Sequence, residues 1–114
     1  MNKIISKELL SEVLGFKIDN CWVDGSNVEW IKDGMSYINI YELAHKCKEW
    51  AIDKDFIIET EYEGKQKAFG SYCICRIFYD GDKIYDNYSE CEYYQKEPEA
   101  IFKACQWILD NKDK

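Results

Sequence analysis

The chain has 114 residues, of which 46% are hydrophobic and 16% aromatic, and it contains a single proline. This length suits one domain with its own core, and the composition excludes a disordered chain. Acidic residues outnumber basic ones by 22 to 15, and the net charge of −7 disfavours binding to nucleic acid or to an anionic membrane surface. We therefore expect protein partners, basic ones in particular.

Export and membrane insertion have no support in the sequence. Residues 1–8 lack the apolar core of a signal peptide, and no run of about 18 apolar residues could cross a membrane. We therefore expect a cytoplasmic protein. A chain of this size needs no disulfide framework, so we expect free thiols at all six cysteines: Cys21, Cys47, Cys73, Cys75, Cys91 and Cys105.

The first 38 residues predict a short helix followed by a β-meander. Ser6 can cap the helix and Gly15 can end it, and between them four apolar residues recur at helical spacing: Leu9, Leu10, Val13 and Leu14. Gly25 and Gly34 then mark turns between short extended runs. These runs are residues 17–23, 28–32 and 36–38.

Residues 39–111 predict a helix, three antiparallel strands and a second helix. Asn39 followed by Glu42 is a capping-box arrangement, and the helix behind it has one apolar face: Ile40, Leu43, Ala44, Cys47, Trp50 and Ala51. The strands are expected at residues 56–62, 71–79 and 83–94, with Asp80 and Gly81 turning the second into the third. Pro98 suits the start of the last helix, whose apolar stripe is Ile101, Ala104, Cys105, Ile108 and Leu109.

The predicted fold class is therefore α+β. The three C-terminal strands form an antiparallel sheet packed against two helices, preceded by the short helix and the β-meander. We expect one domain over residues 1–114, with residues 1–38 and residues 39–111 as its two parts.

This order of elements resembles the small phage proteins described as the phage ABA-sandwich domain. The resemblance covers residues 39–111 and includes the segment from Glu97-Pro98 to Ile108, because the last helix of that group also opens with an acidic or small residue and proline and continues with alanines and bulky aliphatics. It implies a phage or prophage origin and an order of layers. Proteins of this group mostly have no assigned activity, and residues 1–38 look like an addition to the pattern.

No motif indicates catalysis, a metal or a cofactor. His45 is the sole histidine and falls on the solvent face of its helix, near Glu49. Cys73 and Cys75 alternate along a strand and do not form a zinc knuckle. The glycines are isolated, so no phosphate-binding loop is present. We expect a protein that is not an enzyme and that needs no cofactor or metal.

An acidic surface interleaved with tyrosines is the most distinctive feature of the C-terminal half. Clustered carboxylates speed the encounter with a basic partner, and tyrosine supplies broad contact area. The ordinary alternative is a solvated acidic face with tyrosines half-buried in the sheet. The predicted partner-binding residues are Glu59, Glu61, Asp80, Asp82, Asp86, Glu90 and Glu92, with Tyr85 and Tyr88 as anchors.

These observations predict a non-enzymatic phage or prophage accessory protein that acts in the host cytoplasm. Its acidic face would occupy the nucleic-acid groove of a host protein and inhibit a defence factor, such as a CRISPR effector or another nucleic-acid enzyme. The alternative is a small structural or regulatory phage protein that forms a homodimer through a sheet edge or through Trp22, Trp30 and Tyr37. A third hypothesis is a hydrolase that uses a cysteine or a carboxylate pair.

Overall fold

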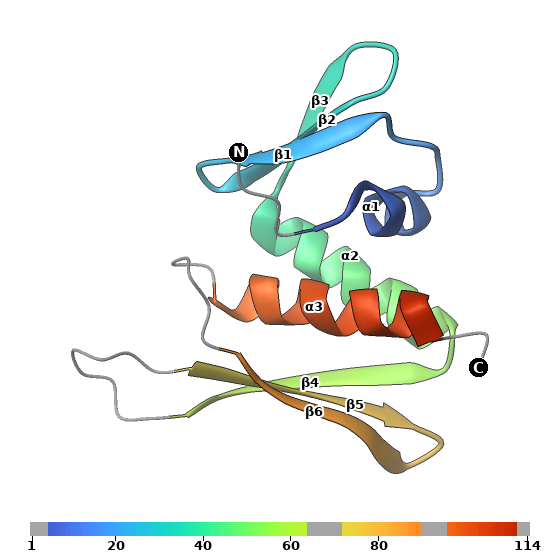
Figure 1. Ribbon diagram of the computed structural model, residues 1–114, viewed down its shortest axis with the longest axis vertical. Coiled ribbons are helices and arrows are strands. Elements are labelled where there is room, and N and C mark those ends of the chain that lie inside the picture. Colours follow the sequence, from blue (N-terminus) through green and yellow to red (C-terminus); the bar gives the residue numbers. More distant parts are fainter. Residues whose placement is uncertain (1–4, 64–71, 90–95, 112–114) are drawn as a thin grey trace.

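Two helices form the middle layer of the molecule and separate two antiparallel sheets (Figure 1). The computed structural model describes residues 5–63, 72–89 and 96–111. Its elements are α1 (Lys7–Leu14), β1 (Asn20–Asp24), β2 (Asn27–Ile31), β3 (Met35–Asn39), α2 (Ile40–Asp53), β4 (Phe56–Glu63), β5 (Tyr72–Tyr79), β6 (Asp82–Ser89) and α3 (Lys96–Asn111). The predicted α+β class, with a short helix and a meander before a sheet packed on two helices, is confirmed.

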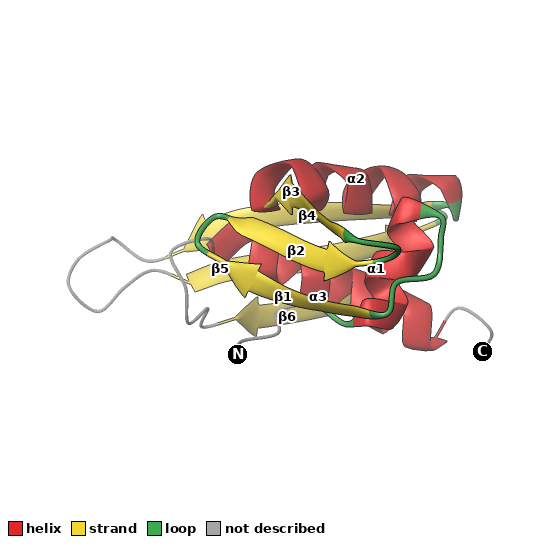
Figure 2. Ribbon diagram, turned by 90° about the horizontal axis from the view of Figure 1, so that it is seen from above, coloured by secondary structure: helices red, strands yellow, loops and turns green. Residues whose placement is uncertain are grey.

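The chain passes through the three layers in order and then returns to the middle layer with α3. Helix α1 and the β1–β2–β3 sheet lie on one side of α2 and α3, and the β4–β5–β6 sheet lies on the other (Figure 1). Seen from above, the two sheets overlap across the helical layer (Figure 2). Of the helices described, none combines the length and apolar character that a membrane crossing requires.

The predicted caps of α1 and α2 are present, whereas α3 begins at Lys96, one residue before the expected Glu97-Pro98. The Ser6 hydroxyl accepts from the Leu9 N–H, and Gly15 ends α1 at φ 87°, a backbone conformation that glycine adopts without steric cost. The Asn39 side chain accepts from the N–H groups of Tyr41 and Glu42 at the start of α2. Both helices thus begin at the residues that their capping signals predict.

The first strand begins later than expected. Its predicted start is residue 17, whereas β1 begins at Asn20. The Ile18 N–H donates to the Ser11 hydroxyl at 3.0 Å, and the Ile18 side chain is buried. This segment is therefore tied to α1 before the meander starts.

Apart from Ile74, the buried hydrophobic side chains of the described residues form one continuous cluster through all the layers. Leu9 from α1, Val28 from β2, Leu43 from α2, Ile77 from β5 and Phe102 from α3 are all part of it. Ser6 donates to Gln106 Oε1 at 2.7 Å and so links two segments 100 residues apart in sequence. The N-terminal helix and meander therefore pack on the same core as the C-terminal sheet.

Candidate interaction surface

One face of the β4–β6 sheet points away from α2 and α3, and no element of the described part of the chain covers it (Figure 1). We call this surface the outer face. Because side chains alternate along a strand, the residues that share it follow from the register. They are Ile57, Glu59 and Glu61 of β4, Ile74, Arg76 and Phe78 of β5, and Lys83 and Asp86 of β6. Ile74, which pairs with Glu61, is buried at 2% exposure, so this face is not exposed over its whole length.

A β-bulge decides which residues of β6 reach the outer face. Phe78 pairs with Lys83, but Ile77 pairs with Tyr85, so Ile84 is an extra residue in the ladder. An uninterrupted hairpin from Asp80-Gly81 would place Tyr85 beside Arg76. The bulge shifts the register by one and places Asp86 there instead.

Two cations, Arg76 and Lys83, lie among the acids of the outer face. Glu59, Arg76 and Asp86 occupy paired positions in a row across the three strands. Arg76 Nη1 lies 3.0 Å from Glu61 Oε1, and Lys83 Nζ lies 3.0 Å from Asp86 Oδ2. The hydrogen bond to Glu61, followed by the charges of Glu61, Asp86 and Glu59, raises the pKa of Arg76 above its ordinary value.

The structure brings together only part of the predicted site. Glu59, Glu61 and Asp86 are exposed on the outer face, and Asp80 and Asp82 are exposed at the tip of the hairpin. The backbone of Tyr88 pairs with Ile74 in the ladder, but its side chain lies outside the described residues, as do Glu90 and Glu92.

The predicted anchor Tyr85 does not lie on the outer face. It was expected to be a surface anchor, but it is half-buried on the face that meets the helices, where its ring centroid lies 5.3 Å from that of Trp107. The bulge at Ile84 is the physical cause, because it exchanges the two faces of β6 beyond that point. Tyr85 is therefore a packing residue.

Two components of the outer face were not predicted from the sequence. Arg76 lies on a separate strand from the acids, so only its register position, opposite Glu59, reveals that it lies among them. The other is apolar: Ile57 is exposed and pairs with the half-buried Phe78 at one end of the face. Side chains alternate between the two faces along a strand, so a strand with Ile58 on its buried face places Ile57 on the opposite, exposed face.

The described thiols lie in the core. Cys21, Cys47, Cys75 and Cys105 have at most 2% of their surface exposed. Cys105 Sγ donates to the Cys47 carbonyl oxygen at 3.5 Å, and its hydrogen bonding with Cys47 and its burial raise the pKa of the Cys105 thiol. A buried, protonated thiol is a poor nucleophile.

His45 is on the surface, as predicted, with Nε2 3.7 Å from Glu49 Oε2 one helical turn away. Such an exposed pair on a helix is ordinary surface electrostatics. Within residues 5–63, 72–89 and 96–111, no group of three or more histidine, cysteine or acidic side chains could hold a metal ion.

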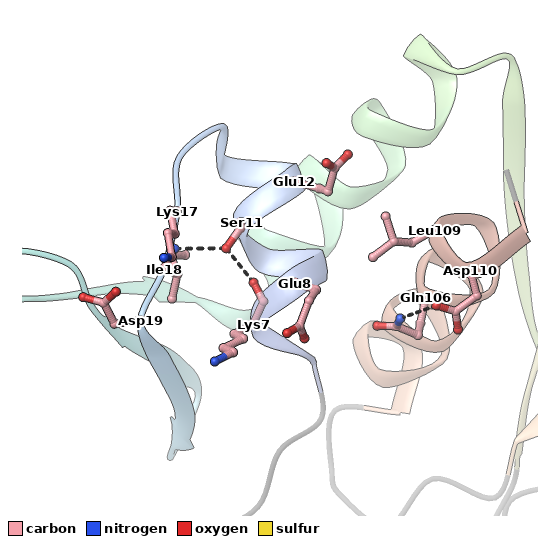
Figure 3. A pocket seen from close by; sticks show the side chains of 10 residues that line it. All are labelled: Lys7, Glu8, Ser11, Glu12, Lys17, Ile18, Asp19, Gln106, Leu109 and Asp110. Carbon is pink, nitrogen blue, oxygen red and sulfur yellow. Dashed lines mark hydrogen bonds between the residues drawn. The ribbon is translucent and has the colours of Figure 1, made fainter. Parts of the chain in front are cut away.

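A cavity of about 790 Å³ lies between α1, residues 17–19 and the end of α3 (Figure 3). Ser11 donates to the Lys7 carbonyl and accepts from the Ile18 N–H, and Gln106 Nε2 donates to Asp110 Oδ1. The walls carry both lysines and acids, so the charges favour no single class of ligand.

Comparisons with protein-family models, with curated proteins and with solved structures find no match. The resemblance to the phage ABA-sandwich group therefore stays a prediction, and the function has to be argued from the surface itself.

Proposed function

We propose that this chain is a non-enzymatic phage or prophage protein that binds a basic host protein through the outer face. The partner is a nucleic-acid-handling protein, such as a CRISPR effector, and the outer face occupies the groove that holds nucleic acid. One observation carries the proposal: a sheet face without a covering element in the described part of the chain presents Glu59, Glu61 and Asp86 in fixed register.

The sheet fixes the backbone positions from which these carboxylates extend. Residues two apart on a strand are about 7 Å apart, and β4 and β6, on either side of β5, are about 10 Å apart. A groove lined by lysine and arginine attracts these carboxylates. Because their backbone is already ordered in the sheet, binding does not have to order a flexible acidic segment. Arg76 reduces the repulsion among the acids and holds Glu61 in place.

A pull-down from host lysate tests the proposal. The tagged protein is used at about 0.1 M and about 0.5 M salt, between which the Debye length falls from about 10 Å to roughly 4 Å. Recovery of a nucleic-acid-handling protein at low salt, with loss at high salt, is expected. Glu59→Lys/Asp86→Lys should abolish recovery.

The matched control carries the same charge change on another surface. Glu42→Lys/Glu49→Lys reverses two exposed acids of α2 and should leave recovery intact. Equal loss in both double variants would mean that net charge, and not the outer face, determines binding. Recovery of no host protein by the wild type would overturn the proposal.

A second candidate function is self-association through the far side of the β1–β3 sheet. Tyr37 is 69% exposed and Met35 64% exposed there. Tyr37 pairs with Glu29, which in turn pairs with Trp22 and accepts from its Nε1. Trp30 does not contribute, because it lies on the core face of the sheet and is only 9% exposed. Sedimentation at rising concentration, with Tyr37→Lys as the disrupting variant, would detect the dimer.

A further inference from the structure

A small cleft of about 410 Å³ opens where α2 ends, β4 begins and β5 turns into β6. Its walls include apolar side chains that are unusually exposed: Ile52 at 58%, Ile57 at 54% and Tyr79 at 45%. The ring of Phe56 lies beside that of Tyr79, with centroids 5.1 Å apart. The cleft therefore has an apolar and aromatic lining that adjoins the outer face through Ile57.

Two carboxylates, Asp55 and Asp80, complete the lining. In the described part of the chain, no ion pair engages either of them. The neighbouring lysines are directed elsewhere, since Lys54 Nζ lies 5.3 Å from the Trp50 ring centroid and Lys83 bonds to Asp86. The cleft thus combines two negative charges with apolar walls and contains no cation among its lining residues.

We propose that this cleft binds one arginine side chain of the basic partner, an inference that rests on the proposed function. The aliphatic stem would contact Ile52 and Ile57, and the guanidinium group would lie near the two aspartates with its plane against the Tyr79 ring. Arginine fits better than lysine, because its planar group stacks on aromatic rings, is weakly hydrated and donates to two carboxylates at once.

The test is a titration of the isotope-labelled protein with acetyl-Ala-Arg-Ala-amide, followed by NMR. Backbone signals of Ile52, Asp55, Ile57, Tyr79 and Asp80 should shift together and saturate. The same peptide with citrulline, which has nearly the same shape and no charge, should bind roughly tenfold more weakly or not at all. Equal binding of the two peptides, or no saturable shift with arginine, would overturn the proposal.

Asparagine variants remove the charges and keep the backbone. Asp55 and Asp80 have φ values of 72° and 53°, a region that asparagine also tolerates, so Asp55→Asn/Asp80→Asn should fold normally. The affinity of this double variant for the arginine peptide should be roughly tenfold lower than that of the wild type. Asp24→Asn/Asp33→Asn, with the same charge change on the other sheet, should bind like the wild type. Tyr79→Leu should also weaken binding, as a variant that changes no charge.

Different results would refute the arginine-binding cleft and the proposed function of the outer face. Arginine-peptide binding without recovery of any host protein would support the cleft and count against the outer face as a partner site. Recovery of a host protein that Glu59→Lys/Asp86→Lys abolishes and Asp55→Asn/Asp80→Asn leaves unchanged would support the outer face and overturn the cleft.

Discussion

Arg76 Nη1 lies 3.0 Å from Glu61 Oε1, at the centre of the acidic outer face of the β4–β6 sheet. The row Glu59, Arg76 and Asp86 shows that the acids are not an unbroken negative surface. Arg76 lowers the repulsion that three nearby carboxylates would otherwise feel, and it orients one of them. Its removal therefore separates the effect of charge from the effect of position.

Arg76→Gln should strengthen capture of a basic partner at low salt and make capture more sensitive to salt, because the face becomes more negative. The partner recovered by the wild type is the reagent for this comparison, measured as bound fraction against salt concentration. Lys7→Gln makes the same charge change on α1 and should alter neither property. Weaker capture at low salt by Arg76→Gln alone would show that the position of Glu61 matters more than the net charge of the face.

Leu9→Ala should destabilise the whole molecule by about 3–5 kcal/mol, because Leu9 is fully buried in the cluster that joins both sheets. Urea unfolding should remain one transition, with tryptophan fluorescence and far-ultraviolet circular dichroism changing together. Glu8→Ala, at the exposed neighbouring position, should stay within about 0.5 kcal/mol of the wild type. A separate early transition in Leu9→Ala would instead show that the N-terminal elements unfold independently.

The stability of the protein should fall at alkaline pH through Cys105. Its pKa is raised in the folded state, so the folded protein keeps the thiol proton while the unfolded chain loses it above about pH 8.5. The contribution is fully present at neutral pH, and above about pH 8.5 it decreases by about 1.4 kcal/mol per pH unit. Urea unfolding between pH 7 and pH 10 measures the slope, and Cys105→Ala should have a shallower one. An unchanged slope would refute this origin.

Asn39→Ala should cost about 1 kcal/mol, since the N–H groups of Tyr41 and Glu42 lose the side-chain acceptor that caps α2. Asn39→Asp keeps an acceptor oxygen at the same position and should cost only a few tenths of that. Thermal unfolding of the two variants gives the comparison. A similar loss in both would indicate that the packing of β3, and not the cap, is affected.

Local signals predicted most of the fold. Ser6, Gly15 and Asn39 define helix ends through their own hydrogen bonds or backbone angles, and the Asp80-Gly81 turn needs only its two residues. Such features depend on neighbours in sequence, so reading the chain is enough to find them. The apolar face of α2 also follows from spacing alone. That of α3 is wider than its predicted stripe, because Phe102 is buried as well, and Leu109 is only partly buried.

The candidate surface was harder to predict because it depends on register across strands. The bulge at Ile84 moves Tyr85 into the helical layer and Asp86 beside Arg76, and the hairpin sequence contains no signal for that shift. The cleft joins Ile52, Ile57 and Tyr79 from three separate elements. Only the packing of α2 on the sheet brings these side chains together.

Competition with nucleic acid is the most direct test of the proposed binding mode. The host protein recovered by pull-down is loaded with a labelled oligonucleotide, and the release of the label is followed by fluorescence anisotropy as the wild type is added. Complete displacement by the wild type, with none by Glu59→Lys/Asp86→Lys, is the predicted result. A ternary complex that retains the oligonucleotide would contradict it, because the outer face would then bind somewhere other than the nucleic-acid groove.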